Sequence, residues 1–438
     1  MTTRRRFVGN LFLGAGAVPL GTHAGALRDG WERRVEDAVR WVSGRSPEEA
    51  ANDEEFWREI RHAFTIDRTM INLNNGGCSP APTHVMEQMI RDLRFSNELP
   101  VDHMWQVLEP RIESVRRELA REFGCDAGEM AITRNASEAN ETMIFGLDLQ
   151  RGDEVILTTQ NYPRMKNAWL QRQRRDGIVI KWVKLETPPP SHDYYVRQIE
   201  AAITPRTKVI ETMHISFMTG YIAPVRRIAD VAKARGIRLF VDGAHAFAHF
   251  PFTRDELGVD YYGTSLHKWL MAPIGTGFLY VRRDRIPSLW PLMAGEEKQT
   301  ADIRKYEEIG THPAANHNSI AVALAFHRAI GVDRKIARLR YLRDRWAKRV
   351  VTESGGRARM LTPIGPGESG AIGVVAFDGL EIPALYGWLK SKHKVITTPL
   401  IHEEFTGLRV TPNVYTTLDE VDRFAELVLH ALKHGVAA

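Results

Sequence analysis

Cysteine is scarce in this sequence, and beyond the first 26 residues no long apolar run occurs. The 438 residues include only Cys78 and Cys125, so no disulfide framework holds the chain together. Whether these two cysteines pair is left open by the sequence. No later stretch approaches the roughly 18 unbroken apolar residues of a membrane-spanning helix. We therefore expect the mature chain to carry no membrane anchor.

Net charge is small as well, and two common hydrolase signatures are missing. The formal net charge is +5, but Arg4, Arg5 and Arg6 lie in a segment that we expect to be removed. Without these three, the 59 basic residues fall to 56 against 54 acidic residues, a net charge of +2. That balance gives no electrostatic footprint for nucleic acid.

The chain contains neither Gly-x-Ser-x-Gly nor His-Glu-x-x-His, which argues against an exported hydrolase.

The first 26 residues are typical of an export signal. Three arginines precede a short, weakly apolar stretch from Leu11 to Leu20, and Ala24-Gly25-Ala26 supplies a small-x-small cleavage site. This order is similar to that of twin-arginine (Tat) signals, which direct folded proteins out of the cytoplasm. We expect residues 1–26 to engage the Tat translocon and to be removed, so that the mature protein lies in the periplasm. A disordered basic tail is the alternative.

Periodic patterns along the rest of the chain predict an α/β protein. Short apolar runs alternate with helical stretches, which favours a mostly parallel sheet covered by helices. An amphipathic helix is predicted over Asp102–Phe123, because apolar residues recur there at helical spacing and Gly124 follows. The expected strands are Met130–Thr133, Glu154–Thr159, Val179–Leu185, Lys208–Ile215, Arg238–Val241 and Gly277–Val281.

The same patterns divide the mature chain into an arm and two domains. A chain of 438 residues with 43% apolar residues is long enough for a large core. Residues 27–85 are predicted to form an N-terminal arm that packs on the small domain. Residues 86–330 are predicted to form a large α/β domain, and 331–438 a smaller α+β domain. The smaller domain is expected to contain a charged helix over 331–355, a strand at Ile372–Phe377, and helices at Pro383–His393 and Leu418–His434.

An aspartate and a lysine form the clearest chemical pattern. Asp242 closes a predicted strand in Val241-Asp242-Gly243-Ala244-His245, and Lys268 lies in Gly263-Thr264-Ser265-Leu266-His267-Lys268-Trp269. A lysine can hold pyridoxal phosphate (PLP) as a Schiff base, and a buried acid can face the cofactor's pyridinium nitrogen. The lysine string alone would mean little, because most lysines are solvated surface charges. The aspartate segment upstream makes a PLP site the better interpretation.

A third segment could bind phosphate. The run Thr133-Arg134-Asn135-Ala136-Ser137-Glu138-Ala139-Asn140 follows a predicted strand and opens a helix. Phosphates favour helix N-termini, where unpaired N–H groups and the helix dipole converge. Ala136 would let the backbone approach the phosphate, and Ser137 can add a hydroxyl donor. The alternative is an ordinary helix cap, with Ser137 and Glu138 in the first turn.

Together these segments resemble the fold-type I PLP enzymes of the class V aminotransferase family, which includes cysteine desulfurases and isopenicillin N epimerase-like proteins. The resemblance covers roughly residues 65–430. It implies that Asp242 bonds to the pyridinium nitrogen, that His245 lies near the phenolic oxygen, and that Lys268 forms the Schiff base. The further cofactor contacts that it implies are Ala136, Ser137, Tyr162, Ser265 and His267, with the Tyr162 ring stacked on the cofactor.

The resemblance extends to the substrate and to a second subunit. Arg409, in Gly407-Leu408-Arg409-Val410-Thr411-Pro412, lies where the family places the arginine that pairs with a substrate carboxylate. Asn75, in the Asn-Asn-Gly-Gly turn, is a further candidate for substrate binding. Gly310-Thr311-His312-Pro313 resembles the family's Gly-Thr-x-Pro element, whose threonine reaches the phosphate of the neighbouring subunit. The match implies a homodimer with shared active sites, in which Thr311 contacts the cofactor.

Two departures from the family pattern bear on the reaction. Residues 391–409 contain no cysteine, so the persulfide chemistry of desulfurases is not expected. Phe217, in His214-Ile215-Ser216-Phe217, stands where the family often has asparagine. Cys78 lies in the glycine-rich loop near the expected site, although a buried structural thiol is the better interpretation. No metal site is expected.

These observations predict an exported PLP-dependent enzyme that acts at the α-carbon or amino group of an amino acid or small peptide. Lys268 could act as the base that removes the α-proton, while Asp242 keeps the ring nitrogen protonated. The expected role is to tailor a secondary metabolite or siderophore by transamination or oxidative deamination, and the chain looks similar in design to the exported PLP enzyme of pyoverdine maturation. The alternatives are an amino-acid epimerase of the isopenicillin N epimerase type and a catalytically silent binding module with the PLP fold.

Overall fold

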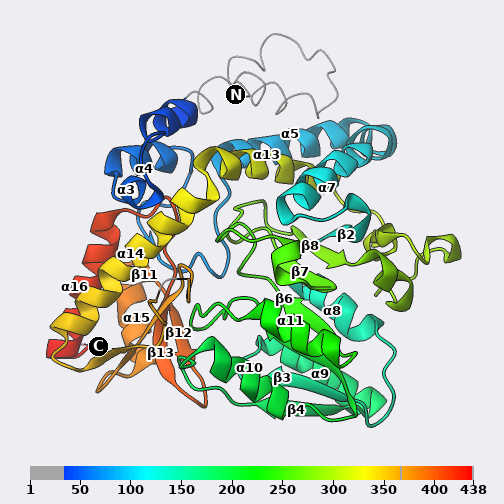
Figure 1. The fold of residues 1–438 in the computed structure, drawn as a ribbon. Coiled ribbons are helices and arrows are strands. Elements are labelled where there is room, and N and C mark those ends of the chain that lie inside the picture. Colours follow the sequence, from blue (N-terminus) through cyan, green and yellow to red (C-terminus); the bar gives the residue numbers. More distant parts are fainter. Residues whose placement is uncertain (1–33, 366, 437–438) are drawn as a thin grey trace.

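The computed structural model describes residues 34–365 and 367–436. The chain forms two units that lie side by side, one around a seven-stranded sheet and the other around a four-stranded sheet (Figure 1). The predicted export signal, residues 1–26, lies outside the described residues. Within the described ranges, no helix is long and apolar enough to cross a membrane.

The larger unit is built on a sheet with the strand order β2-β8-β7-β6-β5-β3-β4. Neighbouring strands are parallel except at β8, which runs antiparallel to β2 and to β7. The strands are β2 (Met130–Thr133), β3 (Glu154–Thr158), β4 (Val179–Val183), β5 (Thr207–Met213), β6 (Arg238–Asp242), β7 (Tyr261–Ser265) and β8 (Gly277–Val281). The predicted α/β fold is confirmed, and each strand expected from the sequence is present within two residues of its predicted ends.

The sequence pattern misses β7, which lies between β6 and β8. Its sequence, Tyr-Tyr-Gly-Thr-Ser, lacks the continuous apolar run that marks the neighbouring strands β6 and β8. Gly263 lets helix α8 (Ala136–Gly146) pack directly on this strand, since a Cβ there would lie 2.2 Å from Asn140 Oδ1. The close packing places Ser265, at the end of β7, beside the start of α8, where its Oγ accepts a hydrogen bond of 3.0 Å from Ala136 N.

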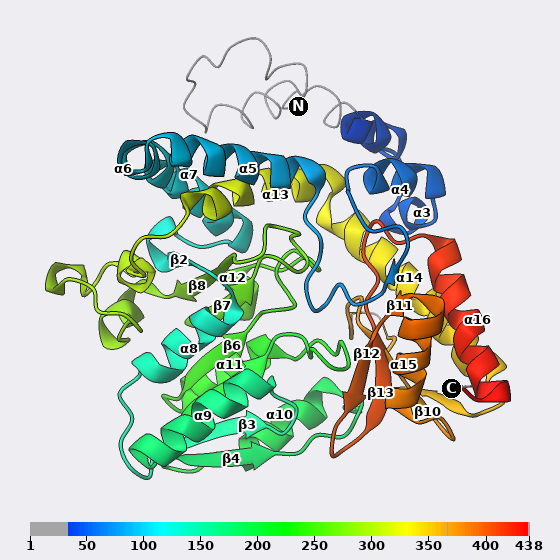
Figure 2. The same ribbon diagram turned by 180° about the vertical axis from the view of Figure 1, so that it is seen from behind.

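Helices cover both faces of the large sheet (Figures 1 and 2). Along β3, Val155 and Leu157 enter one apolar cluster and Ile156 enters the other, as the two-residue period of a strand requires. The first cluster contains side chains of α8 and α9 (Pro163–Asp176). The second contains side chains of α5 (Thr83–Glu98), α7 (Glu109–Phe123), α10 (His192–Ala201), α11 (Val225–Ala234) and α13 (Ala314–Ile330).

The helix predicted over Asp102–Phe123 is interrupted near its start. A short turn, α6 (Pro100–Asp102), leads into a π-helix at His103–Leu108, and α7 follows. Pro110 has no N–H to donate, which removes one regular hydrogen bond at the junction between the π-helix and α7. Gly124 ends α7 with a φ of 81°, in the left-handed region that favours glycine.

The smaller unit is an antiparallel sheet in the order β12-β13-β10-β9, packed against three helices. The α+β architecture predicted for the C-terminal part is therefore confirmed. The strands are β9 (Ala358–Met360), β10 (Gly373–Phe377), β12 (Thr398–Ile401) and β13 (Thr406–Val410), and the helices are α14 (Val332–Glu353), α15 (Ile382–His393) and α16 (Leu418–His434). The domain boundaries at residues 86 and 331 stay a prediction.

The chain before α5 contacts the smaller unit. Helices α3 (Pro47–Ala51) and α4 (Glu54–Arg61) share an apolar cluster with Leu361, Ile372 and Val374. Arg338 of α14 adds a hydrogen bond of 3.0 Å from its Nη1 to Ala51 O. Further on, β1 (Ile71–Asn72) pairs in parallel with β11 (Val395–Ile396), so that the turn after β1 lies next to the smaller sheet.

Candidate cofactor and substrate site

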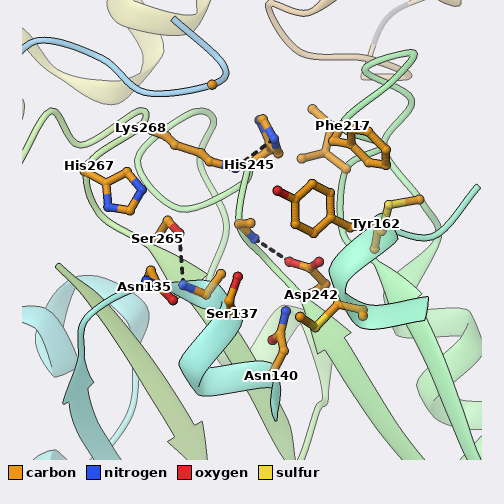
Figure 3. A pocket seen from close by; sticks show the side chains of 16 residues that line it. Asn135, Ser137, Asn140, Tyr162, Phe217, Asp242, His245, Ser265, His267 and Lys268 are labelled. Carbon is orange, nitrogen blue, oxygen red and sulfur yellow. Dashed lines mark hydrogen bonds between the residues drawn. The ribbon is translucent and has the colours of Figure 1, made fainter. Parts of the chain in front are cut away.

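A cavity lies at the carboxyl ends of the parallel strands (Figure 3). Tyr162 follows β3, Phe217 follows β5, Asp242 closes β6 and Ser265 closes β7, and all four line the cavity. Ligands of α/β proteins bind at this edge of the sheet. The empty space measures about 670 Å³, counting the part that is open to solvent.

Most of the residues predicted for the site meet in this cavity. The residues among its lining are Ala136, Ser137, Tyr162, Asp242, His245, Ser265, His267 and Lys268. They come from four separate stretches of the chain, and the parallel strand order brings those stretches together. Arg409 lies beside the cavity, next to Phe217. Asn75 and Thr311 are not among the lining residues.

Lys268 and His245 are joined by a hydrogen bond of 2.9 Å between Nζ and Nε2. Burial lowers the pKa of Lys268 to about 8, against the opposing effect of Asp242. Burial also lowers the pKa of His245 well below its usual value, so its ring is neutral and accepts this bond at Nε2. Nδ1 then carries the hydrogen, and among the described residues this buried donor has no partner.

Asp242 lies at the floor of the cavity with 6% of its surface exposed. Its Oδ1 accepts a hydrogen bond of 3.0 Å from Ala244 N. Burial raises the pKa of this carboxyl, while the Ala244 N–H and the Lys268 cation act in the opposite direction. A nearby cation stabilises a buried carboxylate in its ionised form. Asp242 is therefore suited to face a protonated ring nitrogen.

The other end of the cavity is formed by the N-terminus of α8. Asn135 is the residue that caps this helix, so the Ser137 side chain is left in the cavity wall. Ser265 and His267 extend toward the same end of the cavity (Figure 3). A helix N-terminus with hydroxyl and imidazole groups around it supplies the donors that bind phosphate. The helix does have an ordinary N-terminal cap, which was the alternative interpretation of this segment, and Asn135 provides it.

Aromatic side chains form the wall opposite Lys268 (Figure 3). The rings of Tyr162 and Phe217 meet edge to face, with centroids 5.2 Å apart. Phe217 also holds Arg409, since its carbonyl oxygen accepts a hydrogen bond of 2.8 Å from Arg409 Nη1. The residue that departs from the family pattern therefore contacts both the predicted stacking ring and the predicted carboxylate-binding arginine.

Arg409 is a buried cation held by neutral groups. It is 7% exposed, and its Nη2 donates to Asn74 Oδ1 at 3.0 Å and to Thr398 Oγ1 at 3.1 Å. Burial lowers the pKa of this guanidinium to about 10. Its Nε is buried and without a partner among the described residues. A guanidinium held in this way is suited to a carboxylate ligand, which would supply the missing negative charge.

Asn75 does not reach the site, and its amide is engaged in holding the chain. It is fully buried, and its Nδ2 donates to the carbonyl oxygens of Asn72 and Thr411, each at 3.0 Å. Its Oδ1 accepts a hydrogen bond of 2.5 Å from the Tyr415 hydroxyl. Asn74, one position earlier, is the residue that contacts Arg409. The sequence does not separate the two asparagines, because the direction of the turn decides which one faces the site.

Two further residues lie at the edge of the site or outside it. Thr311 is exposed and precedes α13, away from the cavity lining. Cys78 is partly buried, with its Sγ 3.5 Å from His267 O, and burial raises the pKa of its thiol. Both Cys78 and Cys125 are free thiols in this structure, which answers the open question of pairing.

Several residues of the cavity wall escape sequence reasoning. Asn140 lies in the wall four positions after Ala136, so helical spacing could have revealed that the two share a face. The others include Asn135 and three apolar residues, Met165, Met213 and Ile215. Apolar residues of this kind read as core in a sequence, and only the fold shows that they border a cavity.

The chemistry of the cavity fits PLP at each point where the structure can be compared with it. The unpartnered Nδ1 hydrogen of His245 suits a phenolic oxygen, and the buried Asp242 carboxyl suits the ring nitrogen. The start of α8 suits the phosphate. Lys268, with its lowered pKa, would supply the amine that bonds to the aldehyde.

The fold and the cavity together are those of a fold-type I PLP-dependent enzyme. The family model described as Aminotransferase class-V matches residues 71–380, and the chain belongs to this family. The isopenicillin N epimerase of Streptomyces clavuligerus is 28% identical over 84% of this chain and 97% of its own length. The isopenicillin N epimerase of Amycolatopsis lactamdurans is 29% identical over the same shares.

Solved structures of low identity share the fold. The Escherichia coli cysteine desulfurase CsdA has a TM-score of 0.73 and 21% identity, over 86% of this chain and 98% of its own. A C-DES mutant with glycine covalently linked to its PLP cofactor has a TM-score of 0.75 and 20% identity, over 84% of this chain and 98% of its own. The protein is thus a PLP-dependent enzyme of class V.

Proposed function

We propose that this enzyme acts at the α-carbon or amino group of an amino acid, free or at an accessible position of a small peptide. The observation that carries the proposal is the pair formed by the Lys268 amine and the buried Arg409 guanidinium. The amine is suited to chemistry next to an amino group, and the guanidinium to the carboxylate of the same substrate. Lys268 lines the cavity together with Asp242 and His245, and Arg409 is hydrogen-bonded to Phe217 of the cavity wall.

The residues of the site have separable tasks. When bound, PLP supplies an aldehyde that reacts with amines and a ring that takes up the electrons of a bond broken at the substrate's α-carbon. Lys268 would hold the cofactor through Nζ, and the same amine would act as the base that takes the proton from the substrate's α-carbon. Its pKa of about 8 leaves a useful fraction of free amine near neutral pH. His245 accepts a hydrogen bond from Nζ and so orients it, and Asp242 holds the ring nitrogen.

The reaction branch and the setting form the finer part of the proposal. We propose export by the Tat route and a periplasmic role in tailoring a secondary metabolite or siderophore, through transamination or oxidative deamination. The arginines and small residues of positions 1–26 support export, and an enzyme loaded with its cofactor before export suits a route for folded proteins. A periplasmic enzyme acts on material that passes through the envelope, such as a matured peptide.

Epimerisation is the second candidate, and the comparisons favour it. Two isopenicillin N epimerases match nearly their whole length to this chain. Epimerisation needs the same α-proton removal by Lys268, followed by return of a proton on the opposite face. Residues 391–409 contain no cysteine, which argues against desulfurase chemistry.

A homodimer with shared active sites belongs to the proposal as well. Thr311 is exposed beside α13 and does not line its own cavity, as a residue used by a neighbouring subunit would be placed. Size-exclusion chromatography with light scattering should give twice the monomer mass. Thr311→Ala should weaken PLP binding if a second subunit's threonine contacts the phosphate, and unchanged binding would remove Thr311 from the cofactor site.

The central experiment is a scan of the purified, PLP-loaded enzyme against amino acids in deuterated buffer. Wild type should show a visible absorbance that borohydride removes, and mass spectrometry should find deuterium at the α-carbon of a substrate. Loss of the amino group indicates transamination or oxidative deamination, and inversion of configuration without that loss indicates epimerisation. A colourless wild type after reconstitution would refute the proposal, and cofactor binding without exchange in any amino acid or peptide would favour the silent module. Peptides and siderophores of deletion strains, compared by mass, would then name the natural substrate.

A further inference from the structure

The hairpin formed by β12 and β13 extends from the smaller unit toward the larger one. The two strands pair in antiparallel register from Thr398 with Arg409 to Ile401 with Thr406, which leaves residues 402–405 as the hairpin tip. Figure 2 shows the hairpin on the side of the smaller unit that faces the larger sheet. The tip meets residues 159–162, which connect β3 to α9.

Glu404 makes the main contact of the hairpin tip. One of its carboxylate oxygens accepts a hydrogen bond from the Thr159 hydroxyl, and the other accepts one of 2.8 Å from Gln160 Nε2. His402 adds a contact of 3.3 Å between its Nε2 and Thr159 O. The Nδ1 of this histidine accepts from Glu404 N at 3.2 Å, which leaves the ring hydrogen on Nε2 for the second contact.

Both partners of this contact carry residues of the site. Arg409 stands five positions after Glu404 on the same hairpin, and Tyr162 stands two positions after Gln160 on the same loop. Arg409 is bonded to Phe217 O, and Phe217 packs against the Tyr162 ring. The hairpin is therefore bonded to the larger unit at two points, one at its tip and one at Arg409.

The tip contact is of a kind that water can replace. Glu404 is partly exposed, and its two donors, Thr159 and Gln160, are neutral. Hydrogen bonds between a carboxylate and neutral donors are stronger than neutral pairs but exchange with solvent when a surface element moves.

We propose that Glu404 is a positioning residue. Its bonds to Thr159 and Gln160 hold the β12–β13 hairpin against the loop of Tyr162, and thereby keep Arg409 where a substrate carboxylate bound in the cavity can reach it. The substrate part of this inference rests on the proposed function, and the hairpin contact does not.

The test compares three variants of the PLP-loaded enzyme: Glu404→Ala, Glu404→Gln and, as a matched control, Glu403→Ala. Glu403 is the adjacent exposed acid and has the same charge. Hydrogen–deuterium exchange of residues 398–410 should be at least tenfold faster in Glu404→Ala and unchanged in Glu403→Ala. Glu404→Gln keeps one acceptor oxygen and should lie between the two. Equal exchange in Glu404→Ala and wild type would overturn the proposal.

The second measurement is amino-acid affinity, read from the visible spectrum of the bound cofactor. The probe is the L- or D-amino acid that changes the wild-type spectrum most. Glu404→Ala should raise its Kd or KM about tenfold, equivalent to about 1.4 kcal/mol, with kcat and PLP affinity within about twofold of wild type. Glu404→Gln should recover part of the affinity, and Glu403→Ala should match wild type. A lowered kcat with unchanged Kd, or equal loss in both alanine variants, would overturn the positioning role. If no amino acid or small peptide changes the spectrum, the proposed function fails, whereas hydrogen exchange still decides whether Glu404 holds the hairpin.

Discussion

Replacement of Arg409 by methionine should strongly weaken substrate binding at little cost to the fold. The guanidinium is buried, and its three hydrogen bonds go to the neutral acceptors Phe217 O, Asn74 Oδ1 and Thr398 Oγ1. Methionine is unbranched and apolar and adapts to irregular space, so it can occupy much of the same volume. The substitution therefore removes a cation from an apolar setting and leaves most of the packing in place.

The expected change in stability follows from two opposing effects. Burial lowers the pKa of Arg409 to about 10, whereas a free arginine titrates near 12.5 or above. At about 1.36 kcal/mol per tenfold change in a proton equilibrium, the buried charge costs the folded state roughly 3 kcal/mol. Because the pKa is lowered on folding and both states are charged at pH 7, this cost is fully present there. Removal of the buried charge stabilises the folded state, but the loss of three hydrogen bonds, at about 1 kcal/mol each, offsets this gain. The free energy of unfolding should therefore change by less than about 2 kcal/mol.

Substrate affinity should respond far more strongly. A carboxylate bound by two charge-assisted hydrogen bonds gains roughly 3–5 kcal/mol from the arginine. Its loss should weaken amino-acid binding by roughly 100- to 1,000-fold. Cofactor affinity should stay near wild type, since the cofactor contacts that we propose come from other residues. Arg409→Lys keeps the charge but loses the paired donors of the guanidinium. Its amino-acid affinity should therefore lie between those of wild type and Arg409→Met.

The assay combines thermal unfolding of the PLP-loaded proteins with titration of an amino acid by visible absorbance. Arg409→Met should unfold within a few degrees of wild type and show no saturation by the amino acid. An amino-acid affinity within threefold of wild type would refute the carboxylate role. A fall of more than about 10 °C in unfolding temperature would show instead that the guanidinium is mainly a structural group.

Three further predictions concern the lysine, its pKa and the packing under the cavity. Lys268→Ala should bind PLP without the visible band that borohydride removes in wild type; an unchanged band would assign the attachment to another lysine. Because burial lowers the pKa of Lys268 to about 8, while the unfolded side chain titrates near 10.4, the PLP-free protein should gain stability as pH rises from about 8 to 10. Urea unfolding across that range, with Lys268→Ala as the reference, should show a slope in wild type that the variant lacks. Gly263→Ala would place a Cβ 2.2 Å from Asn140 Oδ1 and should destabilise the fold by roughly 1–3 kcal/mol, whereas the double variant with Asn140→Ala should recover part of the loss in the same unfolding assay.

The parts of the fold that the sequence predicts are those with a local signal. Strand β3 carries the continuous aliphatic run Val155-Ile156-Leu157, because helices cover both of its faces. The strand β7 lacks such a run, since Gly263 and Thr264 serve contacts with α8 and with the chain after β6. Its position depends on packing between distant segments, and no local pattern records that packing.

The residues of the candidate site also differ in whether a local sequence pattern predicts them. Asp242 and Lys268 stand at strand ends in distinctive strings, and the parallel order of β6 and β7 brings those ends to one edge of the sheet. Asn74 and Asn75 are chemically alike, and only the direction of a turn decides that Asn74 contacts Arg409.

The hairpin tip shows that a functional residue can lie at a position that no sequence motif marks. Glu404 is one of 54 acidic residues and stands in no recognisable motif. Its hydrogen-bond partners are distant in the sequence, Gln160 by 244 positions and Thr159 by 245, and only the fold brings them together. A carboxylate whose partners are neutral leaves no charge pattern in the sequence that would connect it to the other segment. The residues that perform chemistry must have particular side chains at strand ends, and those are predictable, whereas a residue that sets the distance between two units needs only an acceptor at the correct place. Changes in such contacts would adjust which substrates the cavity admits while Asp242, His245 and Lys268 stay as they are.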